Sequence, residues 1–242
     1  MQQRLPSLLD PPIAFAHRGA RAHAPENTLE AFSLALTLGA TGLESDVWLT
    51  ADGIAILDHD GVVGTRWRKR PIAELRRDEL PGHLPTLAEL FELCPDTVHV
   101  SLDLKDPAVG PAVLEALARA GDDRRSRTWL CHPDLEVLMP LRDHGIRVLQ
   151  STRLHKIKEG PERRAADLAA HGIDGINLHH TDWTGGLVTL FHRFDRMAFG
   201  WDLQYEHLLR PALRMGLDAV YSDRVDVMME AYRAELGSPE LG

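Results

Sequence analysis

Residues 17–60 read HRGARAHAPENTLEAFSLALTLGATGLESDVWLTADGIAILDHD, and this stretch decides how the chain folds. At its start, residues 13–17 are predicted to form a short buried strand, because an apolar run ends there in polar residues. Apolar residues then recur at helical spacing over 29–36, and a β-rich segment follows over 43–49. The stretch is therefore predicted to form a strand, a helix and a second strand.

Two carboxylates and two histidines occupy special positions in this unit. Glu44 and Asp46 lie two residues apart in the second strand, so both side chains point to one face while Ser45 points to the other. Oxygen ligands on one face suit a divalent cation such as Mg²⁺, Mn²⁺ or Ca²⁺. His17 and His59 each follow an apolar run where it becomes polar. Together these groups are the parts needed for metal-assisted acid–base chemistry on a phosphate ester.

The rest of the chain repeats the same alternation of strand and helix. Repeated β-then-α units favour a parallel sheet, and eight strands in parallel order are expected of a (β/α)8 TIM barrel, with a doubly wound open sheet as the alternative. The Asp52-Gly53 turn predicts a return strand over 54–57, a small hairpin insertion after the second strand. We predict a single-domain α/β barrel over residues 1–242. Its parallel strands are expected at 13–17, 43–49, 98–105, 128–131, 147–150, 175–178, 197–201 and 218–222.

Local signals mark several helix starts. Asn27 and Glu30 have the spacing of a capping box, so Asn27 is expected to cap the first helix. Thr86 and Glu89 form a second such box, and Asp106-Pro107 predicts an N-cap followed by a first-turn proline.

Residues 61–85 show no clear long element. They contain a basic cluster at 66–70, which we predict to be a solvated charged surface rather than a ligand site.

Composition limits the classes of function. The chain has 242 residues, 44% of them hydrophobic, and a formal net charge of −9, which argues against binding to nucleic acid or to an anionic membrane surface. Cys94 and Cys131 have neither the number nor the spacing of a disulfide framework or a zinc site. The chain shows no apolar leader and no segment long enough to span a membrane. We expect a cytoplasmic protein without stable membrane insertion.

Five short motifs occur in order within residues 17–60. They are HRG at 17–19, PENT at 25–28, E-x-D at 44–46, T-x-D-G at 50–53 and HD at 59–60. Their order and spacing resemble the glycerophosphodiester phosphodiesterase family. The resemblance is strong over 15–60, weaker over 85–105 and faint over 196–226. It implies a TIM barrel that hydrolyses small glycerophosphodiesters to sn-glycerol 3-phosphate and an alcohol, within lipid and glycerol metabolism.

The resemblance also implies roles for particular residues. His17 and His59 would act as general acid and base on opposite sides of the phosphorus. Glu44 and Asp46 would hold one divalent metal ion, Mg²⁺, Ca²⁺ or Mn²⁺. The third ligand would be Asp103, which stands where the family usually has the glutamate of Glu-x-Lys.

Substrate contacts follow from the same comparison. Arg18 offers a planar fork and Lys105 a point charge, and both are expected to contact the phosphate. Asp103 and Lys105 fall on the same face of the predicted strand at 98–105, which faces the site in a barrel. Trp201 would form an apolar wall for the alcohol, although Asp202 and Leu203 replace the usual Thr-x-Asn. Residues 221–224 resemble the family's closing strand.

Three alternative functions remain open at this point. The first is a lysophospholipase D-like activity on larger lipid diesters, which requires an apolar entry surface. The second is a different barrel reaction with Lys105 as base, against which the paired histidines argue. The third is a non-catalytic barrel that binds metal or phosphate. The sequence does not predict the oligomeric state.

Overall fold

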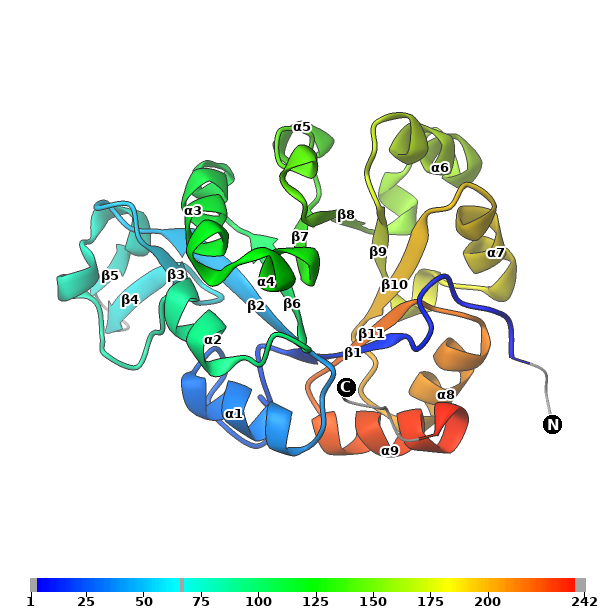
Figure 1. Ribbon diagram of the computed structural model, residues 1–242, viewed down its shortest axis with the longest axis horizontal. Helices are drawn as coiled ribbons and strands as arrows, with labels where there is room; N and C mark the ends of the chain where they lie inside the picture. The colour runs from blue at the N-terminus through cyan, green and yellow to red at the C-terminus, as the bar shows by residue number, and fades with distance from the viewer. Residues whose placement is uncertain (1–3, 66–67, 238–242) are drawn as a thin grey trace.

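The computed structural model describes residues 4–65 and 68–237, and eight parallel strands within these ranges close into a barrel (Figure 1). The strands are β1 (Ile13–His17), β2 (Gly42–Leu49), β6 (His99–Leu104), β7 (Thr128–His132), β8 (Arg147–Thr152), β9 (Gly175–His179), β10 (Met197–Trp201) and β11 (Ala219–Ser222). β1 pairs with both β11 and β2, so the first and last of the eight strands are joined and the barrel is closed. The predicted (β/α)8 barrel is confirmed, and the open doubly wound alternative is wrong.

Helices lie around the outside of the barrel in Figure 1. They are α1 (Leu29–Thr37), α2 (Leu87–Leu93), α3 (Gly110–Ala120), α4 (Asp122–Ser126), α5 (Leu135–Leu138), α6 (Pro161–Ala170), α7 (Gly185–Arg193), α8 (Glu206–Arg214) and α9 (Val225–Leu236). Val113 and Leu117 of α3 share one buried cluster with Val100 and Leu102 of β6. In the part of the chain that the structure describes, no helix is long and apolar enough to cross a membrane.

The inside of the barrel holds a separate apolar cluster. Phe15 stacks on Tyr221 with ring centroids 4.7 Å apart, and Trp129 packs against Phe199 at 5.0 Å. These side chains alternate along their strands with the residues that face the helices, as the two faces of a strand require. The members of this internal cluster are Ile13, Phe15, Trp129, Cys131, Leu149, Met197, Phe199, Ala219 and Tyr221.

The insertion after β2 contains more structure than its sequence indicated. β3 (Ala55–Leu57) returns antiparallel to β2, as predicted. A further hairpin then follows, formed by β4 (Val62–Thr65) and β5 (Arg68–Pro71). The expectation of no clear element over 61–85 is correct for long elements but missed this hairpin, because four-residue strands are too short to show a period. Of the basic cluster, Arg68–Arg70 are exposed, and residues 66–67 lie outside the described residues.

The cap of α1 corrects a prediction. Thr28, and not Asn27, is the N-cap, because its hydroxyl accepts a hydrogen bond from the amide of Ala31 at 3.2 Å. Asn27 is instead buried in a left-handed conformation with φ 54°. Its side-chain oxygen accepts from the Ser45 hydroxyl at 2.8 Å, and its amide nitrogen donates to Asp46 at 3.5 Å. The asparagine therefore connects the loop after β1 to β2.

The other two predicted caps are confirmed. Thr86 and Glu89 form a reciprocal capping box at the start of α2. The Asp106 carboxylate accepts a hydrogen bond from the Ala108 amide at 2.8 Å, and Pro107 begins a short 3-10 turn that leads into α3.

Candidate active site

A cavity of about 270 Å³ opens among the carboxyl ends of the barrel strands. In a TIM barrel this is the end at which catalytic residues gather. Seven of the eight predicted site residues line it, and the exception is His59. The lining residues are His17, Arg18, Arg21, Glu44, Asp46, Ser101, Asp103, Lys105, Cys131, Ser151, Asn177, Trp201, Asp202, Gln204, Tyr221 and Asp223.

Strand register brings the charged residues together. His17 at the end of β1 lies beside Glu44 of β2, and Asp46 lies beside Asp103 of β6. Both pairs consist of inward-facing residues on neighbouring parallel strands, so their side chains converge on the cavity. The turn after β1 needs Gly19, because its φ is +77° and a Cβ would lie 2.7 Å from the Ala31 carbonyl carbon.

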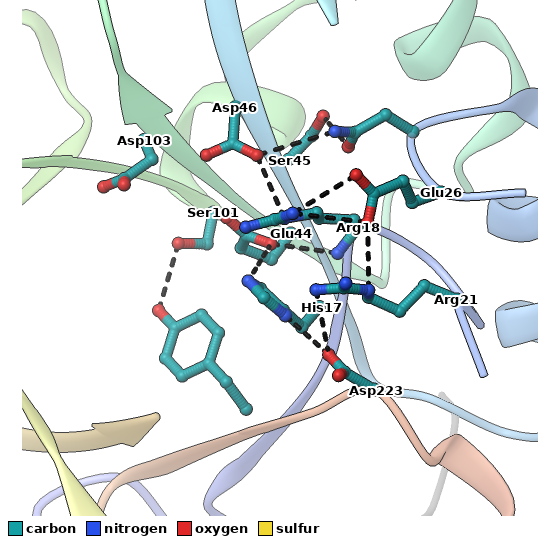
Figure 2. Close-up of polar contacts among 12 residues, drawn as sticks. His17, Arg18, Arg21, Glu26, Glu44, Ser45, Asp46, Ser101, Asp103 and Asp223 are labelled. Atoms are coloured by element: carbon teal, nitrogen blue, oxygen red, sulfur yellow. Dashed lines mark hydrogen bonds and ion pairs between the residues drawn. The ribbon is translucent and has the colours of Figure 1, made fainter. Parts of the chain in front are cut away.

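His17 lies between two carboxylates (Figure 2). Its Nδ1 is 2.6 Å from Asp223 Oδ1, and its Nε2 is 3.8 Å from Glu44 Oε2. Burial alone would lower the pKa of His17, but Glu44 and Asp223 outweigh it and raise that pKa above the usual value. Conversely, the hydrogen bond with His17 outweighs partial burial and lowers the pKa of Asp223. The pair therefore favours a protonated imidazole with Nε2 towards the cavity.

Glu44 is a buried carboxyl group close to other acids. Burial is the largest cause that raises its pKa to about 7, and the charges of Asp46 and Asp103 raise it further against the opposing effect of His17. The backbone amide of Arg18 also donates a hydrogen bond to Glu44 at 2.9 Å. A carboxylate in this environment gains stability from a bound cation. Glu44, Asp46 and Asp103 all line this cavity, and their role as ligands of a divalent ion stays a prediction.

Two basic side chains accompany these acids. Arg18 Nε lies 3.2 Å from Asp46 Oδ2. Lys105 Nζ connects the two aspartates, at 3.0 Å from Asp46 Oδ1 and 2.7 Å from Asp103 Oδ2. These carboxylates outweigh the effect of burial and raise the pKa of Lys105 above its usual range, so the ammonium group stays charged. Both predicted phosphate contacts are therefore held at the cavity as cations.

Four further lining residues were given no catalytic or binding role from the sequence: Arg21, Ser101, Tyr221 and Asp223. Asp223 was part of the recognised closing strand, but its pairing with His17 spans 206 positions of the chain. Ser101 and Tyr221 share a hydrogen bond at 3.0 Å. The alternation in β6 places Ser101 on the same face as Asp103, which was a usable signal. Arg21, which forms an ion pair with Glu26 at 3.0 Å, gave no such signal.

His59 lies apart from this cavity. Its side chain is 39% exposed, and its Nδ1 is 2.8 Å from the neighbouring Asp60 carboxylate. It follows β3, and it is not among the described residues that line the cavity. The predicted role of His59 opposite His17 therefore stays a prediction.

One group of metal-binding side chains occurs elsewhere at the rim. His179, His180 and Asp202 each offer a ligand atom, and these atoms lie within 4.8 Å of one another. Asp202 also lines the cavity, but neither histidine is in its described lining. This group was not predicted as a metal site, because its members belong to two different strand ends.

Comparisons with known proteins agree with the motifs. The model of the glycerophosphoryl diester phosphodiesterase family matches residues 17–227. A curated glycerophosphodiester phosphodiesterase from Bacillus altitudinis is 25% identical over 236 residues, which cover 88% of this chain and 94% of that protein.

Solved structures share the fold. A glycerophosphodiester phosphodiesterase from Thermotoga maritima has a TM-score of 0.79 at 24% identity and covers 90% of this chain and 97% of its own. A phosphodiesterase from Oleispira antarctica, solved in complex with the product sn-glycerol-3-phosphate, has a TM-score of 0.79 at 22% identity. It covers 91% of this chain and 96% of its own. At these identities the two structures establish the common fold.

Proposed function

Because the chain belongs to the glycerophosphoryl diester phosphodiesterase family, a family of phosphoric diester hydrolases, we propose that it hydrolyses glycerophosphodiesters to sn-glycerol 3-phosphate and an alcohol. One observation carries the proposal. His17 lies between Asp223 and Glu44 in a cavity that also holds Arg18 and Lys105. The product complex of the Oleispira antarctica phosphodiesterase supports the choice of substrate.

Glu44, Asp46 and Asp103 are the residues that would hold one divalent ion, Mg²⁺, Ca²⁺ or Mn²⁺. The raised pKa of Glu44 supports this assignment, because burial and neighbouring acids leave its charge short of compensation. Such an ion supplies charge neutralisation at the phosphoryl oxygens and lowers the pKa of a nearby hydroxyl. Lys105 contacts both Asp46 and Asp103, which supports the assignment of Asp103 to the same charged cluster as Asp46.

Proton transfer falls to His17. Its Nδ1 is bound to Asp223, so Nε2 is the atom that gives or takes a proton in the cavity. Asp223 orients the ring and stabilises its protonated form. General acid or base catalysis by a positioned histidine contributes about 10²–10⁴ in rate. His59 would complete the pair, which requires its exposed imidazole to turn towards the cavity.

The remaining lining residues position the substrate. Arg18 and Lys105 would contact phosphate oxygens, and their charge compensates locally for the acidic chain. Trp201 would provide an apolar wall for the alcohol. Two further predictions from the sequence, a cytoplasmic location and one domain over residues 1–242, stay predictions.

The test is release of glycerol 3-phosphate from glycerophosphocholine and glycerophosphoethanolamine. Each substrate is incubated with Mg²⁺, Mn²⁺, Ca²⁺ or EDTA. The variants are His17→Ala, Asp103→Asn and Asp103→Glu. His144→Gln serves as control because His144 is exposed, does not line the cavity and precedes the amino end of β8. We expect metal-dependent release that is lost in His17→Ala and Asp103→Asn but retained in Asp103→Glu and His144→Gln. Folded protein that binds metal without release of product would instead indicate a larger lipid diester or a non-catalytic barrel.

A further inference from the structure

Three metal-binding side chains meet at the rim of the barrel where β9 and β10 end. His179 is the last residue of β9 and pairs in register with Trp201, the last residue of β10. His180 follows His179, and Asp202 follows Trp201. Their ligand atoms lie within 4.8 Å of one another, close enough for one ion to contact all three after small side-chain rotations. We refer to His179, His180 and Asp202 as the rim triad.

Neighbouring side chains hold the rim triad in place. The His179 ring packs edge-on against Trp201, with centroids 4.5 Å apart at 82°. Its Nδ1 lies 2.8 Å from the Thr181 hydroxyl, and its Nε2 lies 3.1 Å from Asp202 Oδ2. The other Asp202 oxygen accepts a hydrogen bond from the Gln204 amide at 3.1 Å. Contacts of this kind orient metal-binding histidines and carboxylates in known sites.

We propose that the rim triad binds a second divalent ion, of the borderline class represented by Zn²⁺ and Co²⁺. Two imidazoles and one carboxylate form the donor set that these ions prefer, whereas Mg²⁺ and Ca²⁺ prefer oxygen ligands throughout. The rim triad would differ chemically from the site proposed above. Glu44, Asp46 and Asp103 of β2 and β6 would offer carboxylate oxygens alone, whereas the rim triad at the ends of β9 and β10 offers two nitrogens and one carboxylate.

Ion binding would rearrange the hydrogen bonds of His179. An ion at Nε2 would replace the hydrogen bond between Nε2 and Asp202. The ring proton would then move to Nδ1 and be donated to the Thr181 hydroxyl, in place of the hydrogen bond that Nδ1 accepts from the Thr181 amide at 3.3 Å. The nearby cation is Arg153, whose guanidinium lies 5.8 Å from the centre of the Trp201 ring. Its charge is offset by Asp182, at 2.8 Å from Arg153 Nε.

The position of the rim triad indicates what the ion would do. Asp202 lines the same cavity as Glu44 and Asp103. A zinc-type site with three protein ligands leaves a fourth position for water or a ligand. The fourth ligand would be an anionic oxygen of a molecule bound in the cavity that Asp202 lines. This inference concerns binding at the rim and does not depend on the reaction proposed above.

The test is titration of chelator-treated protein with Co²⁺, followed by its visible absorption, in the presence of excess Mg²⁺ to occupy the carboxylate site. The variants Asp202→Asn and His180→Gln each remove one donor. Glu44→Gln removes a ligand of the carboxylate site alone, and His144→Gln is the matched control for an exposed histidine. Thermal unfolding checks that each variant is folded, and Asp202→Asn, whose side chain is 47% exposed, is the milder change.

We expect wild type, Glu44→Gln and His144→Gln to bind Co²⁺ with equal affinity, and the two rim variants to bind it at least about tenfold more weakly. Zn²⁺ should displace the Co²⁺ and abolish its absorption. The proposal is overturned if both rim variants bind Co²⁺ as wild type does, or if Glu44→Gln alone abolishes binding. Because the readout is absorption, failure of the proposed hydrolysis would not alter this result.

Discussion

The interior of the barrel has two halves that differ in almost every physical property. The half towards the amino ends of the strands contains the apolar cluster of Phe15, Trp129 and Phe199. The half towards the carboxyl ends contains His17, Glu44 and the other charged residues of the cavity. Several strands contribute to both halves. β1 provides Phe15 to the first half and His17 to the second, two residues further along the same face.

The difference shows how one barrel combines stability with a charged site. Burial of each large apolar side chain in the first half contributes about 1.5–3 kcal/mol to stability. In the second half, burial works against the charged form of Glu44 and raises its pKa to about 7. We infer that the apolar half compensates for the unfavourable environment that the acids need for function. Substitutions in the two halves should therefore separate activity from stability.

The largest effect is expected for His17→Gln. Glutamine can still form a hydrogen bond with Asp223, so the free energy of unfolding should change little. The variant cannot transfer a proton, and kcat/KM for glycerophosphocholine should fall by about 10²–10⁴. Steady-state release of glycerol 3-phosphate and urea denaturation of the same preparation measure both quantities. A fall of less than tenfold would show that His17 is not the proton-transfer group.

The converse change is Phe199→Ala. Phe199 is fully buried in the apolar half, and its ring centroid lies 5.0 Å from that of Trp129. Its truncation should lower the free energy of unfolding by about 3–5 kcal/mol, measured by urea denaturation. The activity of the folded fraction should remain within tenfold of wild type. Phe199→Leu, which leaves a smaller cavity, is the control and should lose less stability. Equal losses of activity and stability would contradict the division into two halves.

The acids of the charged half should make the free energy of unfolding depend on pH when EDTA keeps the protein free of metal. The pKa of Glu44 is about 7 in the folded protein and 4.5 in a model peptide, so the folded state holds more protons between these values. Stability should therefore fall as pH rises through this window, by on the order of 1–3 kcal/mol. The raised pKa of His17 acts in the same direction. The stability that protonated His17 contributes is fully present below pH 6.5, its ordinary pKa, and is lost as the pH rises through its higher pKa in the folded protein.

Urea denaturation at several pH values measures this slope. Glu44→Gln should reduce it, and saturating Ca²⁺ or Mg²⁺ should reduce it in wild type. If the pH dependence of stability is unchanged in Glu44→Gln, groups other than Glu44 cause it.

His99, at the amino end of β6, should cause a smaller pH dependence of stability with the opposite sign. His99 accepts a hydrogen bond from Trp129 Nε1 at 3.2 Å, and burial is the main cause that lowers its pKa from 6.5 to about 4. The unfolded chain binds more protons between these values, so stability should rise with pH from about 4 to 6.5 and then level off. His99→Gln should weaken this dependence by on the order of 1–2 kcal/mol, measured by acid unfolding. If His99→Gln unfolds in acid at the same pH as wild type, His99 is not the source of this dependence.

The sequence was sufficient for most of the barrel and for part of its site. The eight parallel strands and the return strand were predictable because each has its own apolar pattern over neighbouring residues. The alternation in β2 and β6 likewise predicted that Glu44, Asp46, Asp103 and Lys105 face one cavity. The β4–β5 hairpin was missed because its strands are too short for such a pattern.

The N-cap of α1 was predicted wrongly because two parts of the fold compete for the Asn27 side chain. Asn27 and Thr28 are both good N-cap residues, and spacing alone favoured Asn27. The folded chain uses Thr28, because Asn27 is engaged with Ser45 and Asp46 of the neighbouring strand. The role of His59 stays a prediction. His59 does not line the cavity, and its position depends on the path of the loop after β3, which no periodicity in the sequence encodes.

By itself, the sequence determined the order of strands and helices, the inward-facing acids and the family motifs, since all of these depend on residues close together in the chain. Only the tertiary structure decided that Asp223 is the partner of His17 and that His179, His180 and Asp202 meet at the rim. The physical reason is the pairing of strands that lie apart in the chain. β9 pairs with β10 at the rim, and closure of the barrel by β1 and β11 joins residues that are 206 positions apart, so no local pattern specifies which side chains will meet.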